Sequence, residues 1–320
     1  MKAATPVVVL FLSACAGSPK ATPTESPAGA ESCAVARPDF GGPATAAERA
    51  LFAYDAAAPL NLERTVQDSA AGVEISAISF DSPDGGRVTG LLFDPYTYSG
   101  PRPGLVVMHG MPSSASEIGG FATQVSSFGA VGIAIDAPFA RRGGEALQFT
   151  VQDRAEQIQL IKDLQRAVDV LRSLPNVDDD RIGYIGFSYG GAMGALFAAV
   201  ERRIRTAVLV VPDGGLVTHS TSAAGQEFMA SLSCADRNTW LQAMTPIEPI
   251  RFIAQAAPTP LLIQSGRQDE IVPPADAEAL HAAAPEGSRI VWYDAGHGLS
   301  QQAAFDGHAW LVEHIGIEPL

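Results

Sequence analysis

The feature that most restricts the fold of this chain is a regular alternation of short β-branched runs with longer helical patterns, which begins near Val73. Alternation of this kind predicts a mostly parallel sheet with helices on both of its faces. The later runs are separated by enough chain for crossover connections. Eight strands are expected, over residues 73–80, 87–93, 105–109, 132–136, 181–186, 206–211, 260–265 and 289–293.

The segments between these runs supply a turn and the covering helices. Pro83-Asp84-Gly85-Gly86 separates the first two strands and is typical of a turn that closes an antiparallel hairpin. In residues 151–174, apolar side chains recur at spacings of three and four, which indicates a helix with one buried face. These side chains are Ile158, Ile161, Leu164, Val168 and Leu171. Three more helices are expected over residues 188–200, 274–284 and 301–315.

An insertion over residues 214–257 separates the sixth and seventh expected strands. It contains two segments that fit short helices, residues 226–232 and 237–244. Loops beyond roughly 15 residues without structure of their own are uncommon in compact domains. The insertion is therefore predicted to form a small helical cap over one end of the sheet.

The composition excludes several classes of protein. A formal net charge of −14 has the wrong sign for binding a nucleic-acid backbone or an anionic lipid surface. A chain of 320 residues with 47% hydrophobic residues can build a core without a structural metal or a disulfide framework. None of the three cysteines has the CxxC spacing of a zinc or dithiol site. No metal, cofactor or nucleic-acid partner is expected.

The N-terminus has the pattern of an export signal. Lys2 precedes a short apolar stretch, residues 5–12, which is far below the ~20 residues that a membrane-spanning helix needs. Leu12-Ser13-Ala14-Cys15 resembles the lipobox of bacterial lipoproteins. The resemblance implies a signal peptide over residues 1–14 and a lipid on Cys15 that anchors an exported protein to a membrane, facing the periplasm or the cell exterior. An ordinary secretory signal is the alternative.

Residues 15–40 are rich in Ala, Ser, Thr and Pro and lack apolar periodicity. This composition predicts a flexible tether between the lipid and a folded domain over residues 41–320. If Cys15 carries lipid, Cys33 and Cys234 remain in an oxidising compartment, and a disulfide between them is a hypothesis. The sequence does not indicate an oligomeric state.

One short motif points to chemistry. Gly186-Phe187-Ser188-Tyr189-Gly190 matches G-x-S-x-G, a pattern that is weak by itself because chance gives roughly 0.2 matches in a chain with this many glycines and serines. Here it follows an apolar run and precedes a helix that opens with small residues. In that setting a sharp turn lifts a serine hydroxyl clear of the sheet. Ser188 is therefore a candidate nucleophile, which requires an imidazole base and a carboxylate to orient that base.

With these residues in view, the sequence from Val73 to Ile315 resembles the α/β-hydrolase superfamily, in its dienelactone-hydrolase-like and prolyl-oligopeptidase-like branch. The resemblance implies a triad in the chain order Ser, Asp, His. Residues 266–273 resemble the family's G-x-x-D-x-x-V-P segment, which assigns the acid to Asp269. Residues 294–298 resemble its G-H loop, which assigns the base to His297.

The same resemblance leaves rivals open. Dienelactone hydrolases carry cysteine at the position of Ser188, which argues against transferring their substrate. Asp213 is a rival acid because it follows the sixth expected strand, where some hydrolases place it. His219 lies in the cap, where it could line the pocket, although a solvated side chain is favoured. The remaining histidines are interpreted as structural: His109, His281, His308 and His314.

The segment after the third strand, His109-Gly110-Met111-Pro112, resembles the family's H-G-x oxyanion loop. The resemblance implies that the N–H groups of Met111 and Tyr189 hold the oxyanion of the tetrahedral intermediate. Arg141 and Arg142 follow the fourth strand at the same edge of the sheet. They either meet an anionic substrate or pair with surface acids, and the second is favoured.

These residues predict a serine hydrolase, foremost a carboxylic ester hydrolase that works through an acyl-enzyme on a small-molecule ester. A small exopeptidase or amidase of the prolyl-oligopeptidase-like branch is an alternative, because the same triad cleaves amides. Relatives of that kind carry a large propeller domain, for which the roughly 30 residues between Phe40 and Val73 are too few. An inactive surface binding module that keeps the hydrolase scaffold is a further alternative.

Overall fold

A computed structural model describes residues 34–320 of the chain. The predicted signal peptide, the lipidation site Cys15 and one member of the hypothetical disulfide, Cys33, lie outside the described residues. The lipid anchor and the Cys33–Cys234 pairing therefore stay predictions. None of the helices within residues 34–320 has both the length and the apolar character needed to cross a bilayer.

The core of the molecule is one sheet with the strand order β1-β2-β3-β5-β4-β6-β7-β8-β9. The pairings that join β1, β2, β3 and β5 are antiparallel, and all pairings from β5 to β9 are parallel. The predicted mostly parallel α/β architecture is confirmed. The strands are β1 (Glu63–Ala70), β2 (Val73–Asp81), β3 (Arg87–Pro95), β4 (Arg102–Met108), β5 (Val131–Ile135), β6 (Val177–Phe187), β7 (Thr206–Val210), β8 (Leu261–Gly266) and β9 (Arg289–Tyr293).

The sheet has nine strands where the sequence predicts eight, and the additional strand is β1. Every side chain of β1 is exposed. Alternation of apolar and polar residues is what identifies a strand in a sequence, and a strand without a buried face does not have it. β1 is held at the edge of the sheet by its antiparallel backbone ladder with β2.

Two hydrophobic layers enclose the sheet, and the side chains of β4 alternate between them. Val106 and Met108 join the layer formed with α4 (Val151–Ser173) and α5 (Tyr189–Val200). Leu105 and Val107 join the opposite layer, formed with α2 (Gly119–Ser126) and α10 (Gln301–Ile315). Because every residue of β4 is buried, the central sheet is covered on both faces, as the sequence predicts.

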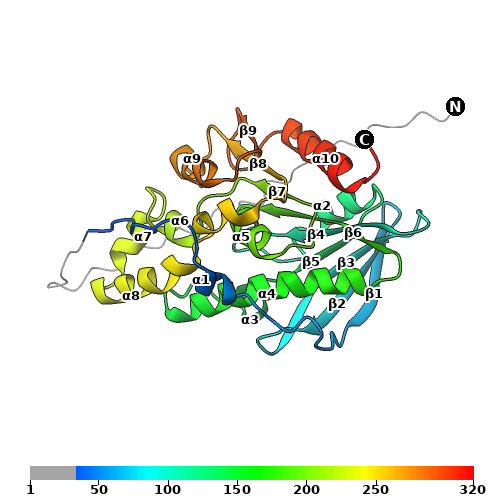
Figure 1. Cartoon of the computed structure of the whole chain (residues 1–320), viewed down its shortest axis with the longest axis horizontal. Coiled ribbons are helices and arrows are strands. Elements are labelled where there is room, and N and C mark those ends of the chain that lie inside the picture. Colours follow the sequence, from blue (N-terminus) through cyan, green and yellow to red (C-terminus); the bar gives the residue numbers. More distant parts are fainter. Residues whose placement is uncertain (1–33) are drawn as a thin grey trace.

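The predicted insertion is helical. Between β7 and β8 lie α6 (Leu216–Ser220), α7 (Gln226–Ser231) and α8 (Cys234–Met244), followed by three 3₁₀ turns, η1 (Thr245–Ile247), η2 (Pro249–Arg251) and η3 (Ile253–Ala256). Figure 1 shows α6, α7 and α8 grouped beyond one end of the sheet. The cap is fastened to the main body where the indole N–H of Trp240, on α8, donates to buried Asp153, on α4, at 2.7 Å.

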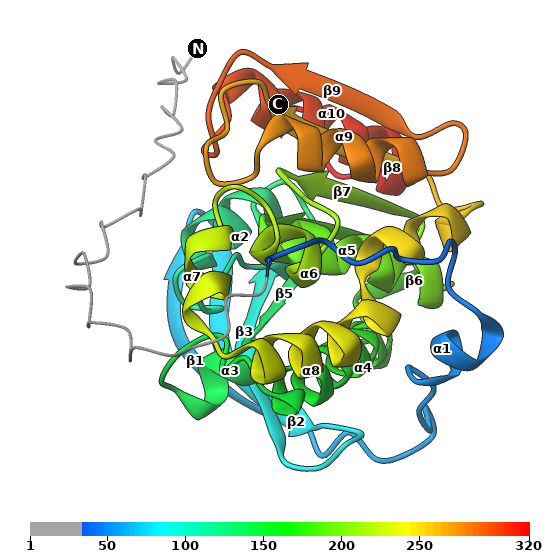
Figure 2. The same ribbon diagram turned by 90° about the vertical axis from the view of Figure 1, so that its left-hand side faces the viewer.

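Residues 34–40 form part of the folded domain, although the sequence assigns them to the flexible tether. Arg37 donates to the carbonyl of Thr218 at 2.9 Å, to the hydroxyl of Thr221 at 3.0 Å and to the carboxylate of Asp276 at 2.6 Å. It thereby joins the N-terminal segment to α6 and to α9 (Pro274–Ala283), and the segment runs between these two helices (Figure 2). An arginine in a Pro- and Ala-rich stretch gives no sequence signal for such distant partners.

The short helices α1 (Ala46–Ala50) and α3 (Pro138–Arg142) complete the helices of the described residues.

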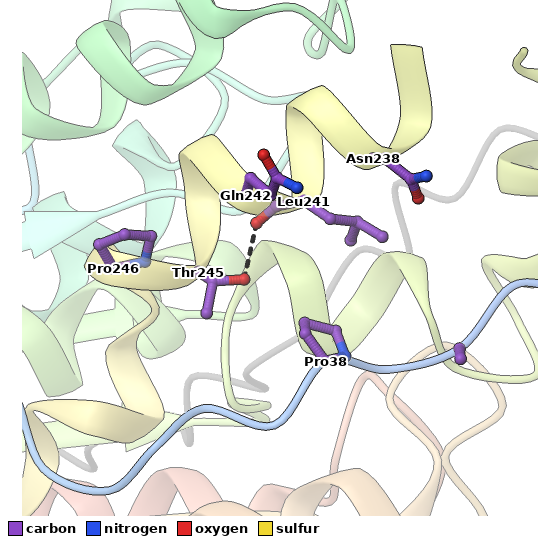
Figure 3. Close-up of a pocket in the computed structure, with 7 residues that line it drawn as sticks. Pro38, Asn238, Leu241, Gln242, Thr245 and Pro246 are labelled. Carbon is purple, nitrogen blue, oxygen red and sulfur yellow. Dashed lines mark hydrogen bonds between the residues drawn. The ribbon is translucent and has the colours of Figure 1, made fainter. Parts of the chain in front are cut away.

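A groove of about 430 Å³ separates this N-terminal segment from α8 (Figure 3). Its lining residues are Ala36, Pro38, Asn238, Leu241, Gln242, Thr245 and Pro246. None of its lining residues is one that the sequence assigns to catalysis.

Candidate active site

The turn that joins β6 to α5 presents Ser188. Its backbone has φ 54° and ψ −115°, an unusual conformation for a residue with a side chain. The turn is tight because both flanking glycines touch backbone. A Cβ on Gly186 would overlap the carbonyl oxygen of Gly190, and a Cβ on Gly190 would lie 2.6 Å from the carbonyl oxygen of Met108. The glycines of the G-x-S-x-G motif are thus required by the close approach of the chain at this turn.

The structure brings Ser188, His297 and Asp269 together from the ends of β6, β9 and β8. The Nε2 atom of His297 lies 3.0 Å from Oγ of Ser188, and its Nδ1 atom lies 2.8 Å from Oδ2 of Asp269. The other oxygen of Asp269 accepts the N–H groups of Ile271 and Val272, each at 2.9 Å. Those two bonds hold the buried carboxylate in one orientation, with Oδ2 directed at the imidazole.

This arrangement assigns a hydrogen-bonding role to each ring nitrogen of His297. An ionised carboxylate only accepts hydrogen bonds, so Nδ1 of His297 carries the hydrogen that Asp269 accepts. Nε2 is then free to accept the hydroxyl proton of Ser188. The ring of Phe187 packs edge-on against the imidazole, with centroids 5.4 Å apart, and restricts its rotation.

The rival acid Asp213 contacts a different imidazole. Its Oδ2 atom lies 3.0 Å from Nδ1 of His219, and its Oδ1 atom accepts the N–H of Gly215 at 2.9 Å. The hydrogen bond with Asp213 raises the pKa of His219 above its ordinary value, against the opposing effect of burial. Sequence reasoning considered these two residues separately. No sequence signal joins an aspartate at a strand end to a histidine on a five-residue helix.

Glu248 contacts the helix that carries His219. It is buried and accepts the N–H groups of Val217 at 3.1 Å and Thr218 at 2.7 Å, which holds α6 in place. Burial raises the pKa of Glu248 to about 8, and its two backbone hydrogen bonds oppose this shift. At neutral pH the protonated, uncharged carboxyl is therefore favoured.

The predicted oxyanion loop lies beside Ser188, where a Cβ added to Gly110 would be 3.4 Å from the serine Cβ. His109 fixes this loop from within the core. Its Nε2 atom accepts the N–H of Ala137 at 3.2 Å, so its Nδ1–H donates to the carbonyl of Gly110 at 2.7 Å. Burial lowers the pKa of His109, which favours the neutral ring. The structural interpretation of His109 agrees with these contacts.

The two predicted oxyanion donors are main-chain groups of Met111 and Tyr189. Tyr189 is the first residue of α5, and the N–H groups in the first turn of a helix have no partner within that helix. Met111 follows Gly110 in the loop beside Ser188. The Tyr189 side chain points away from Ser188 and into the core, where its hydroxyl donates to Gln157 of α4. The oxyanion role of both N–H groups stays a prediction.

The arginines after β5 pair with acids, but these acids are buried on α4 and do not lie on the surface. Arg141 contacts Asp163 at 2.6 Å, and Arg142 contacts Glu156 at 2.7 Å. Burial raises the pKa of Asp163, and Arg141 partly offsets this shift. The pairs join α3 to α4.

The other histidines have structural contacts. His281 lies 3.0 Å from Oγ of Ser265, and His308 and His314 contact main-chain carbonyls at 2.8 and 2.9 Å. Among residues 34–320, no group of three or more His, Cys, Asp or Glu side chains is arranged to hold a metal ion.

Comparison with known proteins agrees with this fold. The model of the prolyl oligopeptidase family, Peptidase_S9, matches residues 120–311, which is more than half of the chain. The solved structure of an acetyl xylan esterase from Paenibacillus sp. R4 is similar with a TM-score of 0.70 at 20% identity, over 84% of this chain and 92% of that one. This likeness shows the α/β-hydrolase fold, and it confirms the resemblance found in the sequence.

Two relatives without a characterised activity also match. Rv2307c of Mycobacterium tuberculosis (strain ATCC 25618 / H37Rv) is 27% identical over 266 residues, which are 82% of this chain and 84% of that protein. YfhR of Escherichia coli (strain K12) is 26% identical over 140 residues. The latter match spans 42% of this chain and less than half, 44%, of YfhR.

Proposed function

Because this chain belongs to the prolyl oligopeptidase family of hydrolases, we propose that it is a serine esterase that cleaves carboxylic esters through an acyl-enzyme intermediate. One observation carries the proposal. The hydroxyl of Ser188 contacts Nε2 of His297, and Nδ1 of the same ring contacts Asp269, at 3.0 and 2.8 Å. Both distances lie within the range for proton transfer to a positioned base.

In the first step, Oγ of Ser188 attacks the ester carbonyl carbon while its proton passes to Nε2 of His297. Asp269 stabilises the imidazolium that forms and keeps the ring oriented. The carbonyl oxygen becomes an oxyanion, for which the N–H groups of Met111 and Tyr189 are the proposed donors. One such donor typically contributes ~10²–10³ in rate.

In the second step, the imidazolium of His297 gives its proton to the leaving alcohol, and the acyl group remains on Ser188. Water then attacks the acyl carbonyl, with His297 accepting its proton. Collapse of this second tetrahedral intermediate releases the carboxylic acid and returns the proton to Ser188.

Two points favour an ester over the substrate of a small exopeptidase. An aminopeptidase has to bind a substrate ammonium, which needs an available carboxylate. The carboxylates that follow β7 and begin α9 already have partners, since Asp213 holds His219 and Asp276 holds Arg37. In addition, a protein of the same fold, the Paenibacillus sp. R4 enzyme, is an acetyl xylan esterase.

The decisive experiment is a substrate panel on the full chain, with p-nitrophenyl acetate, longer acyl esters and aminoacyl amides. The esters are expected to turn over faster than the amides by kcat/KM. Ser188→Ala is expected to abolish hydrolysis of p-nitrophenyl acetate, whereas Ser69→Ala, on exposed β1, serves as the matched control and should keep it. Unchanged hydrolysis by Ser188→Ala would refute the esterase, and faster turnover of the amides would favour the exopeptidase.

Labelling of the same chain with a fluorophosphonate probe distinguishes an enzyme from an inactive binding module. A fluorophosphonate probe reacts with a serine only when a base activates it. We expect labelling on Ser188, located by peptide mapping, and no labelling of Ser188→Ala. Absence of label from the wild-type chain would support the binding module.

We further propose that the protein is exported and anchored through a lipid on Cys15, on the basis of the Leu12-Ser13-Ala14-Cys15 sequence. On expression in a bacterium, the wild-type chain is expected in the detergent phase of a phase separation and Cys15→Ala in the aqueous phase. Retention of Cys15→Ala in the detergent phase would contradict the anchor.

A further inference from the structure

A second imidazole–carboxylate pair lies at the same end of the sheet as the proposed triad, where the parallel strands β6, β7 and β8 end. His219 and Asp213 meet through the same atoms as His297 and Asp269, namely Nδ1 and Oδ2, at 3.0 Å against 2.8 Å. The mechanism proposed above does not use this second pair.

The second pair lies next to the turn that presents Ser188. The N–H of Ser188 donates to the carbonyl of Val210, the last residue of β7, at 2.8 Å, and Asp213 lies three residues further along the chain. β6, β7 and β8 are parallel neighbours, so the segments after them gather at one edge. The negative charge of Asp269 contributes to the raised pKa of His219, which places the two within electrostatic range.

The geometry of His219 leaves one ring edge available. Asp213 is buried and engages Nδ1, which points that side of the ring inward. The side chain is nevertheless 38% exposed. Nε2 lies on the opposite side of the ring from Nδ1, so the exposed edge is the one that can meet a substrate.

Each carboxylate near His219 already has a hydrogen-bond or ion-pair partner. Asp213 accepts Gly215 N–H and the imidazole, Asp269 accepts two N–H groups and His297, and Asp276 pairs with Arg37 from the N-terminal segment. Glu248, from the cap, has a pKa of about 8 and favours the uncharged form at neutral pH. Asp213, Asp276 and Asp269 all raise the pKa of His219. These carboxylates favour the protonated ring, which carries an N–H donor at Nε2.

Resting on the esterase function proposed above, we propose that His219, held by Asp213, forms an anion-binding subsite of the active site that takes a carboxylate carried by the ester substrate. A protonated imidazole donates a charge-assisted hydrogen bond from Nε2 to a carboxylate oxygen. The preferred substrates would then be monoesters of dicarboxylic acids or esters of hydroxy acids.

The test uses pairs of esters that differ only in the distal carboxylate. One series pairs 4-nitrophenyl monoesters of succinate, glutarate and adipate with uncharged 4-nitrophenyl alkanoates of equal length. A second series places the carboxylate on the alcohol side, as acetyl esters of ω-hydroxy acids paired with acetyl esters of the corresponding alcohols. The measured quantity is the ratio of kcat/KM for the charged and uncharged member of each pair, at fixed ionic strength.

We expect this ratio to exceed one for at least one chain length in the wild-type chain, and His219→Gln to lower it by about ten- to a hundredfold. His308→Gln is the matched control, because His308 lies on α10 and contacts the carbonyl of Glu318, and it should leave the ratio unchanged. Thermal unfolding of each variant verifies that it is folded.

The pH dependence separates binding by charge from a change of shape. In the wild-type chain, the ratio should fall as pH rises through the raised pKa of His219, because the ring loses its positive charge. Asp213→Asn removes the main cause of the raised pKa, so the same fall should occur at lower pH. A ratio that does not depend on pH would overturn the proposal.

The outcomes distinguish the two proposals. If the wild-type chain hydrolyses uncharged esters but no charged ester is preferred, or if His219→Gln leaves the ratio intact, the anion subsite is wrong and the esterase stands. If neither member of any pair is hydrolysed, the esterase itself fails, and the subsite with it.

Discussion

The two imidazole–carboxylate pairs at the edge of the sheet are locally alike and differ in what lies on either side of them. In the first, His297 joins Asp269 to Ser188, and the carboxylate is fixed by two main-chain N–H groups. In the second, Asp213 accepts a single main-chain N–H, and the ring of His219 is half-exposed. The same side-chain contact thus occurs once with a further partner on the imidazole, Ser188, and once with the imidazole partly exposed to solvent.

The difference shows that the contact between an imidazole and a carboxylate does not define a catalytic base. What distinguishes His297 is the serine at its Nε2 atom, presented by a backbone turn that glycines alone permit. His219 has the same contact between Nδ1 and a carboxylate and a raised pKa, without that serine. Such a ring suits recognition of a charged group, which is the role proposed for it.

The largest expected effect is on kcat, and it should differ between substitutions of the two carboxylates. Asp269→Asn should lower kcat for an uncharged ester by about 10⁴-fold, because the amide favours the wrong imidazole tautomer. Asp213→Asn should lower it by only about threefold, since its imidazole does not touch Ser188 in the structure. Steady-state kinetics on p-nitrophenyl acetate measures both. Comparable activity of Asp269→Asn, with a large loss in Asp213→Asn, would move the triad acid to the rival position.

A smaller effect concerns the supports of the two pairs. Arg37 reaches α6 and Asp276 from a segment far away in the chain, whereas the first pair relies on its own loop. Arg37→Gln should lower the free energy of unfolding by about 1–2 kcal/mol, because it leaves a buried carboxylate and a carbonyl without their donor. Urea denaturation measures this change.

The control for Arg37 is Arg172→Gln, which removes an exposed ion pair with Asp179 at 3.2 Å. Surface pairs of this kind contribute little, so a change within about 0.5 kcal/mol is expected. An equal effect of both variants would mean that the N-terminal segment contributes nothing specific to holding α6.

The smallest effect is the pH dependence of stability. The pKa of His219 is raised in the folded state, so its contribution is fully present below about pH 6.5 and is lost as pH rises through the raised pKa. His219→Gln should therefore cost more stability at pH 6 than at pH 9, by less than about 1 kcal/mol because the ring is partly exposed. Urea denaturation at the two pH values measures this difference.

The pH dependence of stability that comes from His308 should have the opposite sign. Burial lowers its pKa, so its contribution is present above about pH 6.5 and is lost as pH falls through the lowered value. His308→Gln should cost more stability at pH 9 than at pH 5. If both variants showed the same pH trend, a general charge effect would explain it and the Asp213 contact would not.

Much of this protein was predictable from its sequence because the relevant signals are local. Apolar periodicity marked the buried strands and α4, and the G-x-S-x-G turn marked Ser188. The segments that resemble family motifs identified Asp269 and His297 at the strand ends, where the structure brings them within reach of Ser188. The edge strand β1 was missed because all of its side chains are exposed and carry no periodic pattern.

The sequence by itself determined the alternation of strands and helices, the position of the helical insertion and the residue types of the proposed triad, since each depends on neighbours close in the chain. Only the tertiary structure decided which carboxylate meets which imidazole and that Arg37 fastens the N-terminal segment across α6 and α9. Asp213 and Asp269 both follow a parallel strand, so no local pattern distinguishes them. The difference arises from where the crossover connections deliver His219 and His297, which is a property of the packed sheet as a whole.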